Sequence, residues 1–174
     1  MRSKILLLAV ILLLPSVASA RSITAGDIRL MAGVGPGGNV GGSRLGAAAA
    51  YFLLDLQATY AFTRSLGAVV EVGIGGAETT IPFRARAGLQ FHIPGLRWPV
   101  LPYLGLQFSV AQLFNVLGAE LTYLGARLNL GVDYLLTKTW GLGIVMGFDA
   151  GSTLGTTPAF YGTVETIGYA SFAF

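Results

Sequence analysis

Few side chains in this sequence could carry out chemistry. His92 is the one histidine and cysteine is absent, so disulfides, thiolate metal sites and cysteine nucleophiles are excluded. A histidine can act as general base for a serine nucleophile in acyl hydrolysis or transfer, but a simpler interpretation of His92 is a turn residue at a strand end. The glycine-rich segment 33–42 is followed by no Lys-Ser/Thr pair, so it does not predict a phosphate-binding loop. We therefore expect no metal site, no cofactor and no catalytic residue.

Charged residues are the other candidates, and they alternate with apolar ones. Successive side chains of a β-strand point to opposite faces, so residues two positions apart share a face. In segment 82–91, Arg84 and Arg86 share one face, while Phe83 and Leu89 share the other. The same alternation places nine charged residues on the polar faces of their strands: Arg29, Asp55, Glu71, Arg84, Arg86, Arg127, Asp133, Asp149 and Glu165.

The composition conflicts with a soluble fold. Charged residues make up 11% of the chain, against about 25% in a typical globular domain. Beyond the first 20 residues, however, no run reaches the roughly 18 consecutive apolar residues of a transmembrane helix. In lipid only helices and closed β-barrels satisfy their backbone polar groups, so the composition favours a barrel. The 25 glycines agree with this, because glycine weakens helices and suits crowded, curved strands.

Residues 1–20 have the pattern of a secretory signal peptide. Arg2 and Lys4 precede a short apolar run, and an A-x-A sequence ends at Ala20. We expect cleavage after Ala20, which leaves residues 21–174 as an exported β-barrel domain. Without Arg2 and Lys4, nine of the 11 basic residues face eight acidic ones, too small an excess to predict nucleic-acid binding.

Eight segments show the period-two alternation of β-strands. Each has roughly ten residues or more, enough for a tilted strand to cross a bilayer. The fold class predicted is all-β, an eight-stranded antiparallel transmembrane β-barrel with an up-and-down meander, closed by pairing of the last strand with residues 28–34. The even strand count puts both ends of the barrel domain on the periplasmic side. The predicted strands are 27–35, 45–62, 66–75, 82–91, 102–111, 120–136, 140–150 and 160–174.

Inside one narrow barrel the four basic and five acidic groups should pair, because an unpaired buried charge is costly. Across the turn 76–81, Glu71 has the right parity to face Arg84 or Arg86. The interior of an eight-stranded barrel is just wide enough for side chains to fill. The nine residues are therefore interpreted as a lumen charge network, which forms either a plugged, salt-bridged core or a narrow polar pathway.

Aromatic residues gather at the predicted periplasmic strand ends. Such a belt is typical of barrel residues at a membrane interface. The opposite ends carry fewer aromatics, namely Phe83, Phe114 and Phe160. The predicted periplasmic belt consists of Tyr60, Phe62, Phe91, Trp98, Tyr103, Tyr134, Trp140, Phe172 and Phe174.

With these features the sequence resembles small bacterial outer-membrane barrels of the OmpA, OmpX and OmpW type. Segments 60–67 (YAFTRSLG) and 134–141 (YLLTKTWG) both look like the short periplasmic turn of these proteins. The C-terminal Phe172 and Phe174 resemble the signal read by the barrel-assembly machinery. One departure is Tyr169, which occupies a position where that signal often has glycine. The resemblance covers the whole mature chain and implies an architecture rather than an activity.

The expected function is that of an integral outer-membrane protein with a structural or interaction role, or of a small-solute, porin-like channel. One alternative is a lipid-modifying enzyme such as a lipid A deacylase or acyltransferase. Against it, His92 lies at the predicted periplasmic end, whereas lipopolysaccharide lies in the outer leaflet. A second alternative is a soluble β-barrel that binds an apolar ligand, with apolar residues inside and polar residues outside.

The expected location is the outer membrane of a Gram-negative bacterium. There the barrel would be a monomer in contact with membrane lipid and lipopolysaccharide. During biogenesis its C-terminal strand would be recognised by the barrel-assembly machinery.

If the sequence encodes such a barrel, the protein will fractionate with outer membranes and migrate differently on a denaturing gel before and after boiling. The folded barrel resists detergent at room temperature, because its backbone hydrogen bonds close on themselves. Recovery of the chain in the soluble periplasmic fraction would contradict the predicted architecture.

Overall fold

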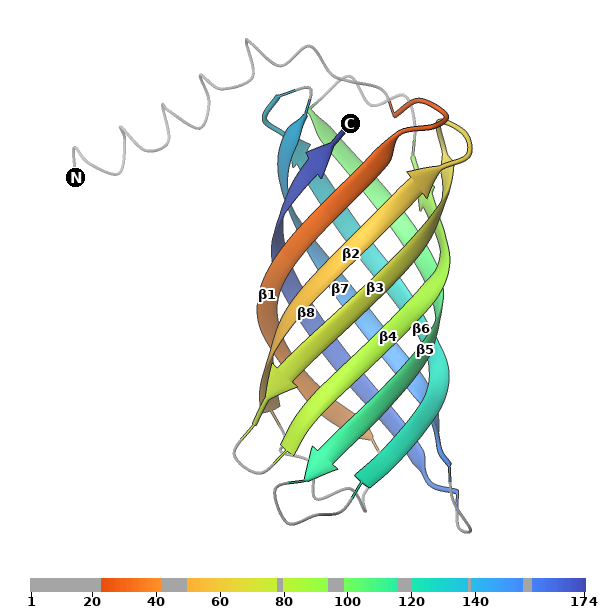
Figure 1. Ribbon diagram of the computed structural model, residues 1–174, viewed down its shortest axis with the longest axis vertical. Helices are drawn as coiled ribbons and strands as arrows, with labels where there is room; N and C mark the ends of the chain where they lie inside the picture. Colours follow the sequence, from red (N-terminus) through yellow and green to blue (C-terminus); the bar gives the residue numbers. More distant parts are fainter. Residues whose placement is uncertain are drawn as a thin grey trace, which may run out of the picture.

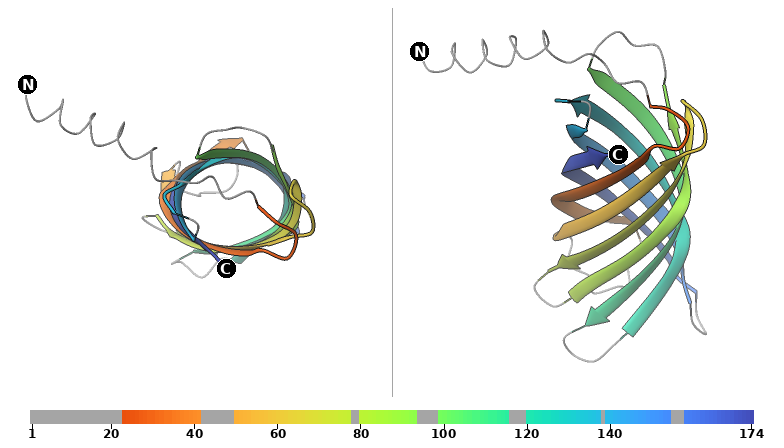
Figure 2. Two further views of the ribbon diagram at one scale, coloured as in Figure 1. Left: turned by 90° about the horizontal axis from the view of Figure 1, so that it is seen from above. Right: turned by 45° about the horizontal axis from the view of Figure 1, so that its top comes forward.

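The computed structural model shows a closed barrel of eight antiparallel strands (Figure 1). It describes residues 23–41, 50–77, 80–93, 99–115, 120–137, 139–154 and 158–174. Viewed from above, the tilted strands form one continuous ring (Figure 2). No helix in these ranges is long and apolar enough to cross a bilayer. The strands are β1 (Ile28–Gly41), β2 (Ala50–Ala61), β3 (Leu66–Gly76), β4 (Thr80–His92), β5 (Val100–Asn115), β6 (Glu120–Leu135), β7 (Trp140–Thr153) and β8 (Phe160–Ala173).

The predicted fold class, strand number and up-and-down order are confirmed. Each strand pairs with its neighbours in the sequence, and β1 pairs with β8 to close the barrel. The closing register joins Arg29 to Ala173 and Val34 to Gly168, within the stretch that the sequence predicted. The predicted signal peptide, residues 1–20, lies outside the described residues, as does the start of the second predicted strand.

Several strands are longer than predicted, and β1 is one of them. Its residues 36–39 read as a loop because they contain proline and glycine, yet β1 continues to Gly41. Pro36 stays in the ladder opposite Phe52 of β2. On the other side, the described β1–β8 pairing runs to Val34 and resumes at Gly37, so Pro36, which has no N–H, lies in the interval. Pairing on both sides therefore keeps this segment extended.

The barrel is apolar outside and polar inside, the reverse of a soluble protein. On β4, Phe83 and Leu89 are 43% and 51% exposed, whereas Arg84 and Arg86 are 4% and 3% exposed. On β1 to β7 the exposed positions likewise carry many Leu, Val, Ile and Phe side chains, whereas the exposed positions of β8 are Phe160, Gly168 and Ala170. This exterior does not fit a soluble barrel with an apolar lumen, and it is typical of a lipid-facing surface.

Some of the interior is nevertheless apolar, which the alternation did not predict. One cluster forms around Leu53, which is fully buried, and Ile167. A second joins Tyr123 to Tyr161, whose ring centroids lie 4.4 Å apart. Large inward side chains are thus distributed between polar and apolar layers.

Glycines on the inner face provide the space for these large side chains. A Cβ added to Gly131 would collide with the ring of Tyr103, and one added to Gly143 would collide with the ring of Tyr169. A Cβ at Gly147 would strike the guanidinium group of Arg127. In a barrel this narrow, a large side chain requires a glycine opposite it, which explains much of the glycine content.

Two turns at the end of the barrel that carries Phe174 share one geometry. In the first, Thr63 Oγ1 accepts hydrogen bonds from the backbone N–H groups of Ser65 and Leu66, at 3.2 and 3.0 Å. In the second, Thr137 Oγ1 accepts from Thr139 and Trp140, at 3.2 and 2.9 Å. The sequence similarity of 60–67 and 134–141 thus corresponds to the same threonine-stabilised turn.

Replacing Gly35 by alanine should destabilise the barrel by about 1–3 kcal/mol, the usual cost of overpacking. Its added Cβ would collide with the Thr166 carbonyl of β8, a backbone atom that cannot rotate away. Gly76→Ala is the matched control, because its Cβ would meet nothing within 4 Å. Urea unfolding in lipid vesicles measures both variants, and equal stabilities would contradict the close β1–β8 approach.

Candidate functional site

All nine charged residues predicted for the lumen lie inside the barrel. Their exposure ranges from 0% for Asp133 to 8% for Arg29. The structure brings six of them together in a central network, places Arg29 and Asp133 in a separate pair, and leaves Asp55 apart from both. The central network consists of Glu71, Arg84, Arg86, Arg127, Asp149 and Glu165.

Arg86 spans the lumen from one wall to the other. It lies directly opposite Glu71 in the β3–β4 ladder, and its Nη1 donates to Glu71 Oε1. Its Nη2 donates to Asp149 Oδ2 at 3.1 Å and to Glu165 Oε2 at 3.0 Å. Of the two partners that the sequence left open for Glu71, the structure therefore selects Arg86, and it adds two acids from the far side of the barrel.

Arg127 completes the central network from β6. It lies opposite Asp149 in the β6–β7 ladder, and its Nη1 donates to Asp149 Oδ2 at 2.8 Å and also to Glu165 Oε2. Arg84 forms an ion pair with Glu165 and lies over the ring of Tyr51, 4.7 Å from the centroid. The two acids of β7 and β8 are thus shared among three arginines.

Neutral polar side chains close the network into a ring, and sequence analysis did not include them among the site residues. Arg127 Nε donates to Asn129 Oδ1, and Asn129 Nδ2 donates to Gln107 Oε1 at 2.8 Å. Gln107 Nε2 donates to Glu71 Oε2 at 3.3 Å. The signal that could have found them was the alternation itself, since Gln107 and Asn129 share the polar faces of their strands.

The separate ion pair of Arg29 and Asp133 lies nearer than the central network to the end of the barrel that carries Phe174. Arg29 Nη1 donates to Asp133 Oδ2, and Arg29 Nη2 donates to Ser171 Oγ at 2.7 Å. Tyr169 donates its hydroxyl hydrogen to Asp133 Oδ1. Tyr169 is therefore a partner of this pair, at the position where the sequence departs from the expected glycine.

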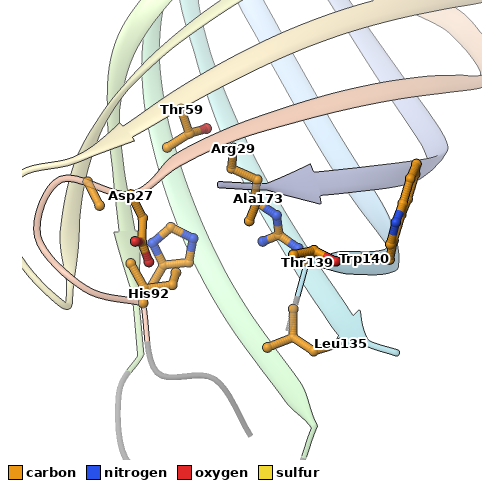
Figure 3. Close-up of a pocket in the computed structure, with 10 residues that line it drawn as sticks. Asp27, Arg29, Thr59, His92, Leu135, Thr139, Trp140 and Ala173 are labelled. Atoms are coloured by element: carbon orange, nitrogen blue, oxygen red, sulfur yellow. The ribbon is translucent and has the colours of Figure 1, made fainter. Parts of the chain in front are cut away.

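A cavity of about 40 Å³ lies at the mouth of this end (Figure 3). Asp27, Arg29 and His92 line it together with apolar side chains such as Leu135 and Trp140. This volume accommodates only a few water molecules. The cavity lies at the barrel mouth among residues of β1, β2, β4, β6, β7 and β8, and it is smaller than a channel entrance of solute size.

His92 does not have the surroundings of a catalytic base. It is the last residue of β4, its side chain is buried, and its Nε2 lies 3.0 Å from Gln90 Nε2. Its ring lies 5.7 Å from that of Tyr103. Among the described residues no serine hydroxyl bonds to His92, and no three His, Asp or Glu side chains are placed to hold a metal ion.

The aromatic residues predicted for the belt divide into outward and inward ones. Trp140 packs edge-on against Phe172, with centroids 4.9 Å apart, and Phe172 lies 5.7 Å from Phe174. Tyr103 is a correction, because it points into the lumen at 3% exposure and cannot belong to an outward belt. Its parity on β5 matches Gln107, not the outward Leu104. Trp98 lies outside the described residues. The belt residues that are exposed on the outer surface are Tyr60, Phe62, Phe91, Trp140 and Phe174.

Several solved structures of small outer-membrane barrels have the same fold. The outer membrane protein OprG from Pseudomonas aeruginosa superposes with a TM-score of 0.64 at 16% identity, over 88% of this chain and 98% of that one. Neisserial surface protein A matches with a TM-score of 0.63 at 16% identity, over 87% and 98% of the two chains. The N-terminal barrel domain of OprF from Pseudomonas aeruginosa matches with a TM-score of 0.61 at 11% identity, over 87% and 100%.

The chain has the fold of these eight-stranded barrels. No family model matches its sequence, and no curated protein matches it either. At identities this low the likeness establishes the architecture that the sequence resemblance implied. It leaves the function to be argued from the lumen and the surface of this chain.

Arg86→Leu should lower the free energy of unfolding by about 3–5 kcal/mol, because it leaves buried Glu71 without its ion-pair partner and takes one arginine from Asp149 and Glu165. Arg64→Leu is the control, since Arg64 is an exposed arginine in the turn between β2 and β3 and should change stability by less than about 0.5 kcal/mol. Unfolding by urea in lipid vesicles gives both values. An unchanged midpoint for Arg86→Leu would contradict a stabilising network.

Proposed function

We propose that this protein is a monomeric outer-membrane barrel of a Gram-negative bacterium whose lumen is closed. In this proposal it acts as a structural or interaction protein, and solutes do not pass through it at rest. The observation that carries the proposal is the ring of charged and polar side chains across the lumen, in which Arg86 joins acids on opposite walls.

The membrane location is supported by the exterior of the barrel. Exposed Leu, Val, Ile and Phe side chains cover the strands, and aromatic residues such as Trp140, Phe172 and Phe174 gather at one end. Aromatic side chains favour the interface between lipid and water. We infer that this end is periplasmic, and that lipid and lipopolysaccharide are the molecules that contact the outer surface.

The C-terminal strand supports a second partner. Phe172 and Phe174 end a strand whose outer face is apolar, and they resemble the signal for the barrel-assembly machinery. We propose that this machinery reads the two phenylalanines while β8 is still unpaired with β1. In the folded protein the N–H of Ile28 donates to the carbonyl of Phe174 at 3.2 Å, so the same strand is then occupied by β1.

A comparison of two energies supports a plugged lumen over one that opens with voltage. A potential of about 100 mV does work of about 2.3 kcal/mol on one elementary charge. Separating one partner from a buried ion pair costs about 3–5 kcal/mol, and Arg86 alone contacts three acids. Ordinary membrane potentials are therefore too small to open this network.

A narrow small-solute channel is the second candidate. It is favoured by polar side chains on both sides of the network: Thr59 and Gln90 toward the end with Phe174, and Thr153 and Thr163 toward the other. Such a channel would need the ion pairs to exchange partners. The lipid-modifying enzyme has less support, because Gln90 rather than a serine is the described partner of His92.

In planar bilayers the wild-type protein should stay at baseline conductance up to about 100 mV, for the energetic reason given above. The double variant Arg86→Ala/Glu71→Ala, which removes both residues of one bridge, should show discrete conductance steps. Arg64→Ala, outside the lumen, should behave as wild type. Steady open steps from the wild type would contradict the closed lumen and favour the channel.

A further inference from the structure

One buried acid in the lumen, Asp55, has no hydrogen-bond or ion-pair partner among the residues that the structure describes. Four of the five interior acids form ion pairs, namely Glu71, Asp133, Asp149 and Glu165. Asp55 forms none, although it is only 5% exposed, and neither of its carboxylate oxygens accepts a hydrogen bond within the described part of the chain. With four arginines against five acids, the interior carries one excess negative charge, and the geometry places it at Asp55.

The arginines nearest to Asp55 are already engaged. Arg86 uses both terminal nitrogens on Glu71, Asp149 and Glu165, and Arg127 uses its Nε and Nη1 on Asn129 and the same two distal acids. An isolated buried carboxylate is among the most costly groups that a protein interior can hold. The folded barrel is therefore expected to acquire one positive charge at this position.

A cavity of about 20 Å³ lies beside Asp55. This volume holds one water molecule or an ion of similar size. Its oxygen-bearing side chains are Asp55, Gln57, Glu71 and Tyr169. The hydroxyl hydrogen of Tyr169 is donated to Asp133, and the amide nitrogen of Gln57 is already bonded to Thr59 and Gln90. Carboxylate and amide oxygens are the ligands that hard cations prefer.

The charged and titratable groups around this cavity come from four strands. Glu71 of β3, Arg127 of β6 and Tyr169 of β8 line it, while Arg84 and Arg86 of β4 act on Asp55 over a longer range. The neighbouring β1 and β7 contribute Met31, Gly33 and Val145, which carry no charge. Asp55 is therefore the member of this group that lacks a counter-charge.

We propose that Asp55 and its cavity form a binding site for one monovalent cation no larger than a water molecule, either a proton or an alkali metal ion. The cavity is lined by two carboxylates and one amide, and because Glu71 is paired with Arg86 the excess charge is a single negative one. Among the described residues no group of three acidic or histidine side chains is placed to hold a divalent metal ion. The site neutralises the lumen whether the barrel is plugged or conducts, so it does not rest on the proposed function.

The test measures the free energy of unfolding of the full barrel in lipid vesicles as the concentration of each cation is changed. In one arm sodium chloride replaces choline chloride at constant ionic strength, and in the other the pH falls from about 8 to about 5, a range in which an unfolded aspartate stays ionised. If the folded state binds one such cation, the folded-to-unfolded ratio rises by up to about tenfold for each tenfold increase in that cation.

Two variants with the same charge change show where the cation binds. Asp55→Asn removes the unpaired carboxylate, so it should abolish the cation dependence and fold at least as stably as wild type at high pH without sodium. Glu165→Gln also removes one negative charge, but it breaks a paired site and should lower stability. The difference in unfolding free energy between wild type and Asp55→Asn removes the contribution of His92 and other groups that titrate in the same way in both proteins.

A dependence on sodium that Asp55→Asn abolishes assigns an alkali ion, and a dependence on pH alone that it abolishes assigns a proton. The proposal is overturned if wild type shows neither dependence, if Asp55→Asn retains it, or if Asp55→Asn fails to fold. None of these results depends on conductance. The proposed cation site can therefore be refuted while the proposed closed lumen is supported, and the closed lumen can be refuted while the cation site is supported.

Discussion

The structure depends on one constraint: charges enclosed in a narrow apolar shell must find partners inside it. Across the middle of the described strands the outer surface offers none, because its large exposed side chains are aliphatic and aromatic. Arg84 and Arg86 of β4 are therefore held by acids of β7 and β8, on the other side of the lumen. Arg127 of β6 is held by the acids of the nearby β7 and β8. The same ion pairs connect β3, β4, β6, β7 and β8. The contacts that neutralise the buried charges are therefore also the contacts that fill the lumen.

The constraint also accounts for the unusual composition. A lumen filled by arginines and tyrosines has room for them only where the opposite position lacks a side chain, as Gly147 does for Arg127 and Gly131 does for Tyr103. Glycine is thus a packing partner here rather than a source of flexibility. Asp55 lies close over Gly73 in the same way, but within the described residues its carboxylate oxygens accept no hydrogen bond and form no ion pair. That exception distinguishes the proposed cation site from the paired charge network.

Period-two alternation predicted the strands and the shared inward face of the charges, because both follow from the pleat. The apolar composition, with the need to satisfy backbone polar groups in lipid, predicted the barrel and its closing β1–β8 pair. It could not predict which charges meet. Arg86 reaches Asp149 and Glu165 across the lumen, a contact set by barrel diameter and strand stagger, which local patterns do not encode. Tyr103 was misplaced because an aromatic at a strand end suggests an interface even when its parity points inward. Pro36 was read as a break because its ladder pairing comes from strands distant in sequence.

A double-mutant cycle on Arg86 and Glu71, which face each other in the β3–β4 ladder, tests the central claim most directly. The free energies of unfolding of wild type, Arg86→Leu, Glu71→Leu and the double variant in lipid vesicles give the coupling between the two side chains. If paired charges organise the lumen, the double variant will be far more stable than the sum of the single losses implies, with a coupling of at least about 2 kcal/mol. Additive losses, with a coupling within about 0.5 kcal/mol of zero, would contradict the account.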